Sequence, residues 1–258
     1  MTHLQNIGTL QLFIGLGFIF LAQGCSILFR LGLARDLAVG AIRTFAQLFI
    51  MGYALTYIFA CPVKLVSLLV FSFMVAAATH IVGSRIKTKA VRFRLPVFFS
   101  MFAPYLLVAA MVTGVIIQAK PWYDPMYLIP IGGMVVGNSM SSLAVALERL
   151  MADLRSKREM VEMRLCLGAT DWEASRDLAS DAIKAGMIPS INAMMGVGVV
   201  FLPGMMTGQI LAGADPLASI RYQIVVMLML AASAALSTSA AVLLVRKRCF
   251  GRAQQPLV

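Results

Sequence analysis

The sequence predicts an all-α, polytopic membrane protein. Of its 258 residues 60% are hydrophobic, the mean hydropathy is +0.87, and only 13% are charged, values outside the range of ordinary soluble domains. The charged residues gather in short runs between long apolar stretches. A net charge of +11 would suggest nucleic-acid binding in a soluble protein, but charges placed in this way set membrane topology instead. We therefore expect a lipid membrane as a partner and no nucleic acid.

Apolar stretches long enough to cross a hydrocarbon core of about 30 Å recur along the whole chain. They cover residues 8–29, 37–60, 63–83, 95–117, 126–147, 187–213 and 222–245. Residues 1–258 thus form a single transmembrane domain of about seven helices. The one long charged segment, residues 148–186, lies between the fifth helix and the sixth.

Basic residues divide unequally between the two sides of these spans. Most of the 22 Lys and Arg residues fall in the first, third and fifth loops and in the C-terminal tail. The positive-inside rule places those parts in the cytoplasm and the N-terminus outside. We expect a multi-pass protein of the cell inner (cytoplasmic) membrane.

The fifth span, residues 126–147, is not built to face lipid. Pro130, Gly132 and Gly137 permit close packing or local unwinding, and Asn138 with the serines that follow brings hydrogen-bonding groups to membrane depth. This span is expected to face protein or a pathway.

The charged segment divides into two predicted helices. Residues 148–167 have an amphipathic pattern that continues the fifth span, with Asp153 and Lys157 spaced for an ion pair. Gly168 can take the left-handed torsion that ends a helix. Thr170 and Glu173 form a capping box for a second helix, which runs from Trp172 to about residue 186. The pattern alone is compatible with a docking surface or with a helix in the headgroup region.

The sixth span, residues 187–213, is predicted to be a broken helix. Pro189, Pro203 and four glycines weaken it, which is tolerated where protein or a water-filled cavity satisfies the backbone. Neutral and soft side chains form a set of weak metal-pathway candidates: Asn138, Asn192, Met194, Met195, Met205, Met206, Thr207 and Gln209. Thioethers favour Cu(I) over iron, but methionines also fill gaps between moving helices. No metal site stands out, because no carboxylate lies within a span.

No cofactor motif is visible in the sequence. The four cysteines, Cys25, Cys61, Cys166 and Cys249, lack the spacing of a zinc site or a disulfide framework. No Gly-x-x-x-x-Gly-Lys-Ser/Thr occurs, so the chain is not expected to bind ATP by a P-loop or to act as an enzyme.

A resemblance to a known family rests on two regions. Glu162, Gly168, Ala169, Thr170 and Trp172 resemble the cytoplasmic loop of ABC-transporter permeases, although Met163 and Arg164 replace the usual two alanines. Residues 188–195, 202–216 and 221–224 resemble the FetB-type iron-export permease family, which includes plant homologues linked to aluminium tolerance.

This resemblance implies a permease subunit of an ABC transporter that exports iron or another metal. ATP and Mg would be bound by a separate ATP-binding subunit, and the permease would form a homodimer. The implied coupling-helix segment, which docks on that subunit, comprises Glu162, Gly168, Ala169, Thr170, Asp171, Trp172 and Glu173. An ion-coupled secondary transporter and a non-transporting scaffold or sensor are the alternatives.

Overall fold

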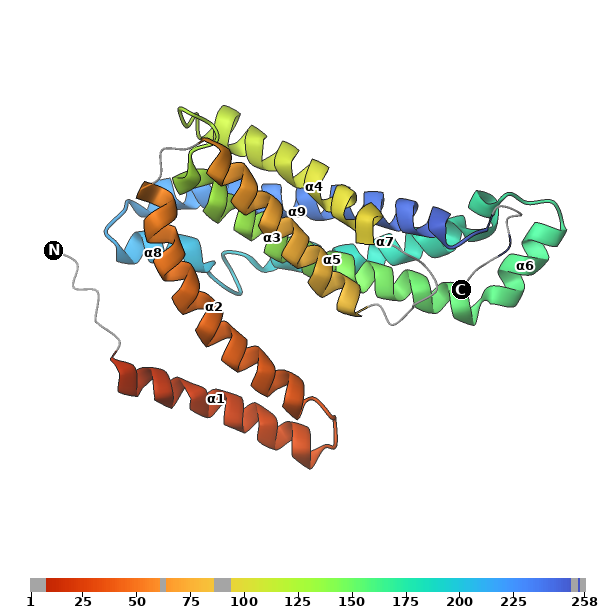
Figure 1. Ribbon diagram of the computed structural model, residues 1–258, viewed down its shortest axis with the longest axis horizontal. Helices are drawn as coiled ribbons and strands as arrows, with labels where there is room; N and C mark the ends of the chain where they lie inside the picture. Colours follow the sequence, from red (N-terminus) through yellow and green to blue (C-terminus); the bar gives the residue numbers. More distant parts are fainter. Residues whose placement is uncertain (1–7, 61–63, 86–93, 252–254, 256–258) are drawn as a thin grey trace. The chain divides into compact units, whose positions relative to one another are not determined.

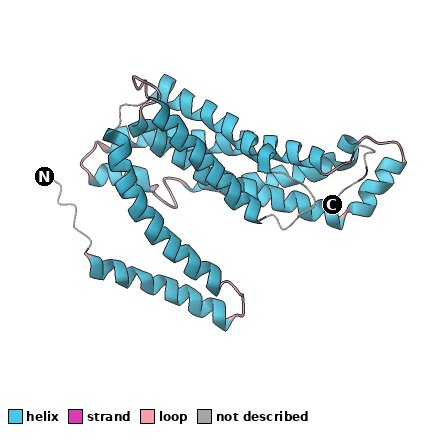
Figure 2. Cartoon of the chain, in the orientation of Figure 1, coloured by secondary structure: helices cyan, strands magenta, loops and turns pink. Residues whose placement is uncertain are grey.

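The computed structural model describes residues 8–60, 64–85, 94–251 and 255. These residues are helical almost throughout and include no strand (Figure 2). The helices, labelled in Figure 1, are α1 (Thr9–Leu28), α2 (Ala34–Ala60), α3 (Lys64–Arg85), α4 (Arg94–Met111), the π-helix η1 (Val112–Ile116), α5 (Pro125–Ser156), α6 (Arg158–Cys166), α7 (Asp171–Gly196), α8 (Gly204–Leu211) and α9 (Pro216–Arg248). The all-α prediction is confirmed.

The chain divides into two compact units. In the first, α1 and α2 form a helical hairpin, and the backbone N–H of Leu33 donates a 3.1 Å hydrogen bond to Ser26 Oγ at the turn. Most large apolar side chains of this hairpin are exposed, among them Phe18 and Ile42. Long helices that expose apolar surface on every side are typical of contact with lipid.

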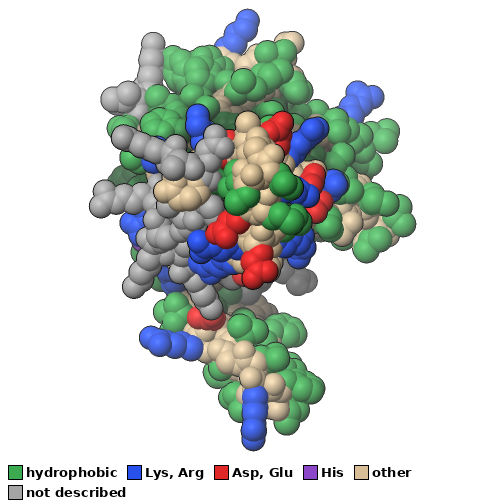
Figure 3. All heavy atoms as spheres, turned by 90° about the vertical axis from the view of Figure 1, so that its right-hand side faces the viewer, with side chains coloured by type: hydrophobic (Ala, Val, Ile, Leu, Met, Phe, Trp, Pro, Cys, Tyr) green, Lys and Arg blue, Asp and Glu red, His purple; other side chains and the backbone are tan. Residues whose placement is uncertain are grey.

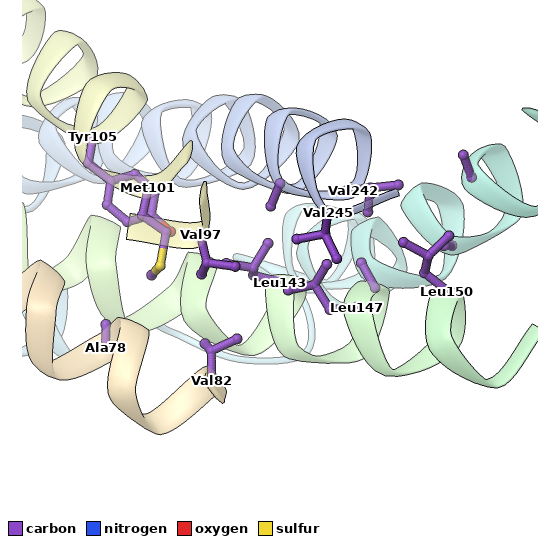
Figure 4. Packing of buried hydrophobic residues seen from close by; sticks show 14 of the residues in the cluster. Ala78, Val82, Val97, Met101, Tyr105, Leu143, Leu147, Leu150, Val242 and Val245 are labelled. Carbon is purple, nitrogen blue, oxygen red and sulfur yellow. The ribbon is translucent and has the colours of Figure 1, made fainter. Parts of the chain in front are cut away.

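The second unit is a helical bundle of α3, α4, α5, α7 and α9 around one apolar core. Figure 4 shows side chains from α3, α4, α5 and α9 that pack against one another; those labelled are Ala78, Val82, Val97, Met101, Tyr105, Leu143, Leu147, Leu150, Val242 and Val245. The apolar side of residues 148–167 supplies part of this core, since Leu150, Leu154 and Val161 are buried. The amphipathic pattern of the charged segment is therefore confirmed.

Helix α7 runs antiparallel to α5 and α9 and crosses both at Gly186. A Cβ atom added there would lie 2.6 Å from the carbonyl oxygen of Ser142 in α5 and 3.1 Å from Thr238 Cγ2 in α9. Only glycine permits this approach. A serine pair joins α5 and α7 one turn further along α7, where the Oγ atoms of Ser142 and Ser190 lie 3.2 Å apart.

Six of the described helices are long and apolar enough to cross a membrane, close to the seven predicted. The difference lies in residues 187–213. Helix α7 begins at Asp171 and ends at Gly196, residues 197–203 form a loop, and α8 is short. Gly198, with φ +84°, and Pro203 account for this interruption. The prediction of a separate second helix that ends near Gly186 was wrong, since α7 continues through that residue to the loop.

The interior of the bundle carries hydroxyl groups at several levels. Ser139 in α5 and Ser233 in α9 are both fully buried, and their Oγ atoms lie 3.0 Å apart. Such pairs satisfy polar groups that lipid would leave without a partner. The fifth span thus faces protein, as its sequence predicts.

Candidate functional site

The candidate site has two parts, at opposite ends of α7. The first is the tip segment, defined as residues 157–173, where α5 gives way to α6 at Lys157. Figure 3 looks onto the end of the bundle that carries α6 and shows acidic and basic side chains gathered there.

Ion pairs organise the helices around the tip segment. Arg158 pairs with Glu162 at 2.7 Å, and Arg164 pairs with Asp177 of α7 at 3.1 Å. Asp153 pairs with Arg149 at 2.8 Å. The predicted pair of Asp153 with Lys157 was wrong, because the helix ends at Ser156 and Lys157 leaves the helical geometry that the pairing requires, with φ −110°.

The turn between α6 and α7 has the caps that its sequence predicts. Gly168 has φ +91°, a torsion that most side chains would strain. Thr170 Oγ1 accepts a hydrogen bond from the backbone N–H of Glu173, and Glu173 Oε2 accepts one from the backbone N–H of Thr170 at 2.8 Å. The backbone N–H and then the hydroxyl of Thr170 lower the pKa of Glu173. This capping box fixes where α7 begins.

Arg246, near the end of α9, holds this turn in place. Its Nη1 donates hydrogen bonds to the carbonyl oxygen of Asp171 at 3.0 Å and to Ser175 Oγ at 3.1 Å, and it lies 3.4 Å from Asp171 Oδ2. The guanidinium carbon lies 4.8 Å from the centre of the Trp172 ring, within cation–π range. Sequence reasoning missed Arg246, which was counted only among the basic residues of the tail.

The tip segment still offers side chains to solvent. The side chain of Glu162 is 45% exposed, Trp172 is 39% exposed and Leu167 is 81% exposed. Part of the Trp172 ring therefore contacts Arg246, and part remains exposed to solvent. All seven residues predicted to dock lie in this segment: Glu162, Gly168, Ala169, Thr170, Asp171, Trp172 and Glu173.

The second part is a cavity of about 380 Å³ near the other end of α7. Its wall includes Asn138 of α5, Ser190 of α7, Met205 of α8 and Gln223 of α9, together with residues 201–204. A second cavity of about 410 Å³ shares Leu202, Pro203, Gln223 and Met227 with the first. Met194 and Met206 line this second cavity.

The predicted pathway residues divide between these walls and other places. Asn138 and Met205 line the first cavity, and Met194 and Met206 the second. Asn192, Met195, Thr207 and Gln209 line neither. Met195 is 78% exposed, and Thr207 Oγ1 donates a 3.1 Å hydrogen bond to the carbonyl oxygen of Pro203. Four of the eight predicted pathway residues thus line one or the other of these adjoining cavities.

Gln223, like Ser190, Met134 and Met227, lines the first cavity and was not predicted from the sequence. It is only 5% exposed, and its Oε1 has no hydrogen-bond partner in the described part of the chain. An amide within the predicted span of residues 222–245 was a usable signal, because such groups are costly at membrane depth. Among the described residues, no group of three or more His, Cys, Asp and Glu side chains is placed to hold a metal ion.

Comparison with known proteins extends over nearly the whole chain. The model of the Uncharacterised protein family (UPF0014) matches residues 9–250. The chain is 38% identical over 216 residues to the UPF0014 membrane protein slr1647 of Synechocystis, covering 84% of this chain and 83% of that protein. It is 35% identical over 230 residues to the "Probable iron export permease protein FetB" of Escherichia coli, covering 89% and 87%.

A plant relative is also similar. The chain is 32% identical over 226 residues to the Arabidopsis thaliana protein ALUMINUM SENSITIVE 3, covering 88% of this chain and 81% of that protein. No solved structure matches the chain. These relatives confirm the resemblance to the FetB-type family that the motifs indicated. The chain is a multi-pass membrane protein and belongs to the UPF0014 family.

Proposed function

We propose that this chain is the permease subunit of an ABC transporter that exports iron or another metal. ATP and Mg are bound by a separate ATP-binding subunit, which docks on the tip segment, and the chain itself performs no covalent chemistry. The main support for this proposal is that one helix, α7, begins in the tip segment at Asp171 and lines the first cavity at Ser190. At 1.5 Å per residue, these positions are about 28 Å apart along the helix.

A continuous helix transmits movement because its backbone hydrogen bonds resist bending. Arg246 ties the start of α7 to α9, and the close crossing at Gly186 holds its middle against α5 and α9. When the ATP-binding subunit displaces the tip segment, α7 therefore moves as well. Either the part of the cavity wall on α7 shifts relative to α8, or α9 moves together with α7. In either case the access to the cavity changes.

The basic residues support the orientation that this mechanism needs. By the positive-inside rule they favour a cytoplasmic tip segment and C-terminus and an outside N-terminus, in the inner membrane. Two copies of the permease with two ATP-binding subunits complete the proposed transporter. The name of the Escherichia coli relative, a probable iron export permease, supports export as the direction and a metal as the cargo.

Reconstitution in proteoliposomes tests this proposal. With iron and Ag(I) tried in turn as the cargo, the permease and its ATP-binding subunit should move a metal ion only when both proteins, ATP and Mg are present. A Trp172→Ala, Leu167→Ser variant should keep its insertion in the membrane but lose ATP-dependent transport. Transport by the permease alone, driven by an ion gradient, would contradict the proposal and favour a secondary transporter.

A further inference from the structure

Thioether side chains converge on the two cavities beside α7. Met134 of α5, Met205 of α8 and Met227 of α9 line the first cavity. Met194 of α7 and Met206 of α8 line the second, which Met227 also borders. Methionines from four helices, α5, α7, α8 and α9, thus line these two adjoining cavities.

None of the described residues that line the two cavities has an ionisable side chain. The cost of moving an ion from water into a medium of low polarity grows with the square of its charge. A bare divalent or trivalent ion would need carboxylates to offset that cost, and a monovalent ion needs far less compensation. The electrostatics of these walls therefore select against bare Fe(II), Fe(III) and Al(III).

An uncommitted oxygen lies at the junction of the two cavities. Gln223 borders both, is almost fully buried, and has an Oε1 atom without a hydrogen-bond partner among the described residues. Such an atom is costly to bury unless a ligand satisfies it. Asn138 and Ser190, whose side chains are neutral and contain oxygen, also line the first cavity.

We infer that the first cavity binds a soft monovalent cation, Cu(I) or Ag(I), where Gln223 borders it. The ligands are methionine thioethers and the Gln223 amide. Thioethers and neutral walls match such ions, which tolerate low coordination and weak donors. This inference rests on the proposed function and names the chemical class of its cargo as soft and monovalent.

Silver binding to the purified full-length chain tests the site, since Ag(I) is stable to air and water. The four cysteines are replaced by alanine first, because thiolates would bind silver strongly. Isothermal titration in detergent should then show one saturable Ag(I) site per chain. Met205→Leu and Met227→Leu, which nearly conserve volume, should each weaken binding by about tenfold or more. Gln223→Leu should weaken it in the same direction.

The matched control is Met195→Leu, since Met195 lies on α7 but outside both walls and is 78% exposed. It should leave the affinity unchanged. Three results would each overturn the inference. The first is an equal loss of affinity in Met195→Leu and Met205→Leu, and the second is unchanged binding in both Met205→Leu and Met227→Leu. The third is Fe(II) binding at the same site as tightly as Ag(I). ATP-driven iron transport without silver binding would refute this inference alone. Silver binding without ATP-driven transport of any metal would refute the proposed function alone.

Discussion

Arg246 Nη1 lies 3.0 Å from the backbone carbonyl oxygen of Asp171, although the two residues are 75 positions apart in the chain. The contact joins the end of the last transmembrane helix to the first residue of α7. The Arg246 side chain is only 9% exposed, so the ionic and hydrogen-bonding contacts form largely away from water. The tip segment is therefore attached to the bundle at Asp171, the first residue of α7.

Arg246→Ala should destabilise this attachment by about 2–4 kcal/mol, since it removes charge-assisted hydrogen bonds from a buried position. The apparent melting temperature in detergent should fall, and ATP hydrolysis by the partner subunit should become independent of the permease. Arg248→Ala, at an exposed position in the same turn, is the control and should change neither quantity. Equal melting temperatures for the two variants would argue against the attachment.

Gly186→Ala should destabilise the bundle by about 1–3 kcal/mol, because the new methyl group would overlap α5. Its Cβ would lie 2.6 Å from the Ser142 carbonyl oxygen and 2.7 Å from Ala146 Cβ. Gly137→Ala is the matched control, because no heavy atom lies within 4 Å of its Cβ position. That variant should be neutral or more stable by about 0.5–1 kcal/mol. Thermal unfolding of both variants checks the crossing, and a tolerated alanine at 186 would refute it.

The capping box predicts a pH dependence. The pKa of Glu173 is lowered from its ordinary value of 4.5, so its contribution to stability is present above that value and is lost as the pH falls through the lowered pKa. The stability difference between the wild type and Glu173→Gln should be constant at neutral pH and shrink in acid. Unfolding followed from about pH 7 to about pH 3 measures it. A difference that grows in acid would contradict the capping geometry.

Cys249 should resist alkylation in the folded protein. Burial raises the pKa of its thiol to about 11, and the side chain is almost fully enclosed. Near pH 8 only a small fraction is thiolate, the reactive form. Cys166 is exposed at the end of α6 and should react with a maleimide much faster, as mass spectrometry of the labelled peptides can show. Equal rates at the two positions would mean that the end of α9 is not packed as described.

Local signals in the sequence predicted most of the helices and the turn at Gly168. Hydropathy marked the spans, and the Thr170 and Glu173 pair marked the start of α7 to within one residue, because capping depends on neighbours three positions apart. The amphipathic pattern of residues 148–167 predicted an apolar face that covers the core, and Leu150, Leu154 and Val161 are buried there. It did not predict the burial of Asp153.

Contacts between distant residues could not be predicted in this way. The interaction of Arg246 with Asp171 depends on how α7 and α9 lie together, and nothing in either local sequence specifies that arrangement. The same holds for the cavity, which gathers Asn138, Ser190, Met205 and Gln223 from four helices. Of the predicted methionines, Met195 lies outside both walls because its position on α7 faces away from them.

The most direct test of the docking proposal uses the native Cys166, which lies in the tip segment and is exposed. The rate at which a membrane-impermeant maleimide labels it is measured with and without the ATP-binding subunit. As a control, labelling of Val199→Cys is measured, since Val199 is 91% exposed in the loop at the opposite end of α7. Docking on the tip segment predicts that the bound subunit slows labelling of Cys166 and leaves Val199→Cys unchanged. Undiminished labelling of Cys166 in the assembled complex would contradict it.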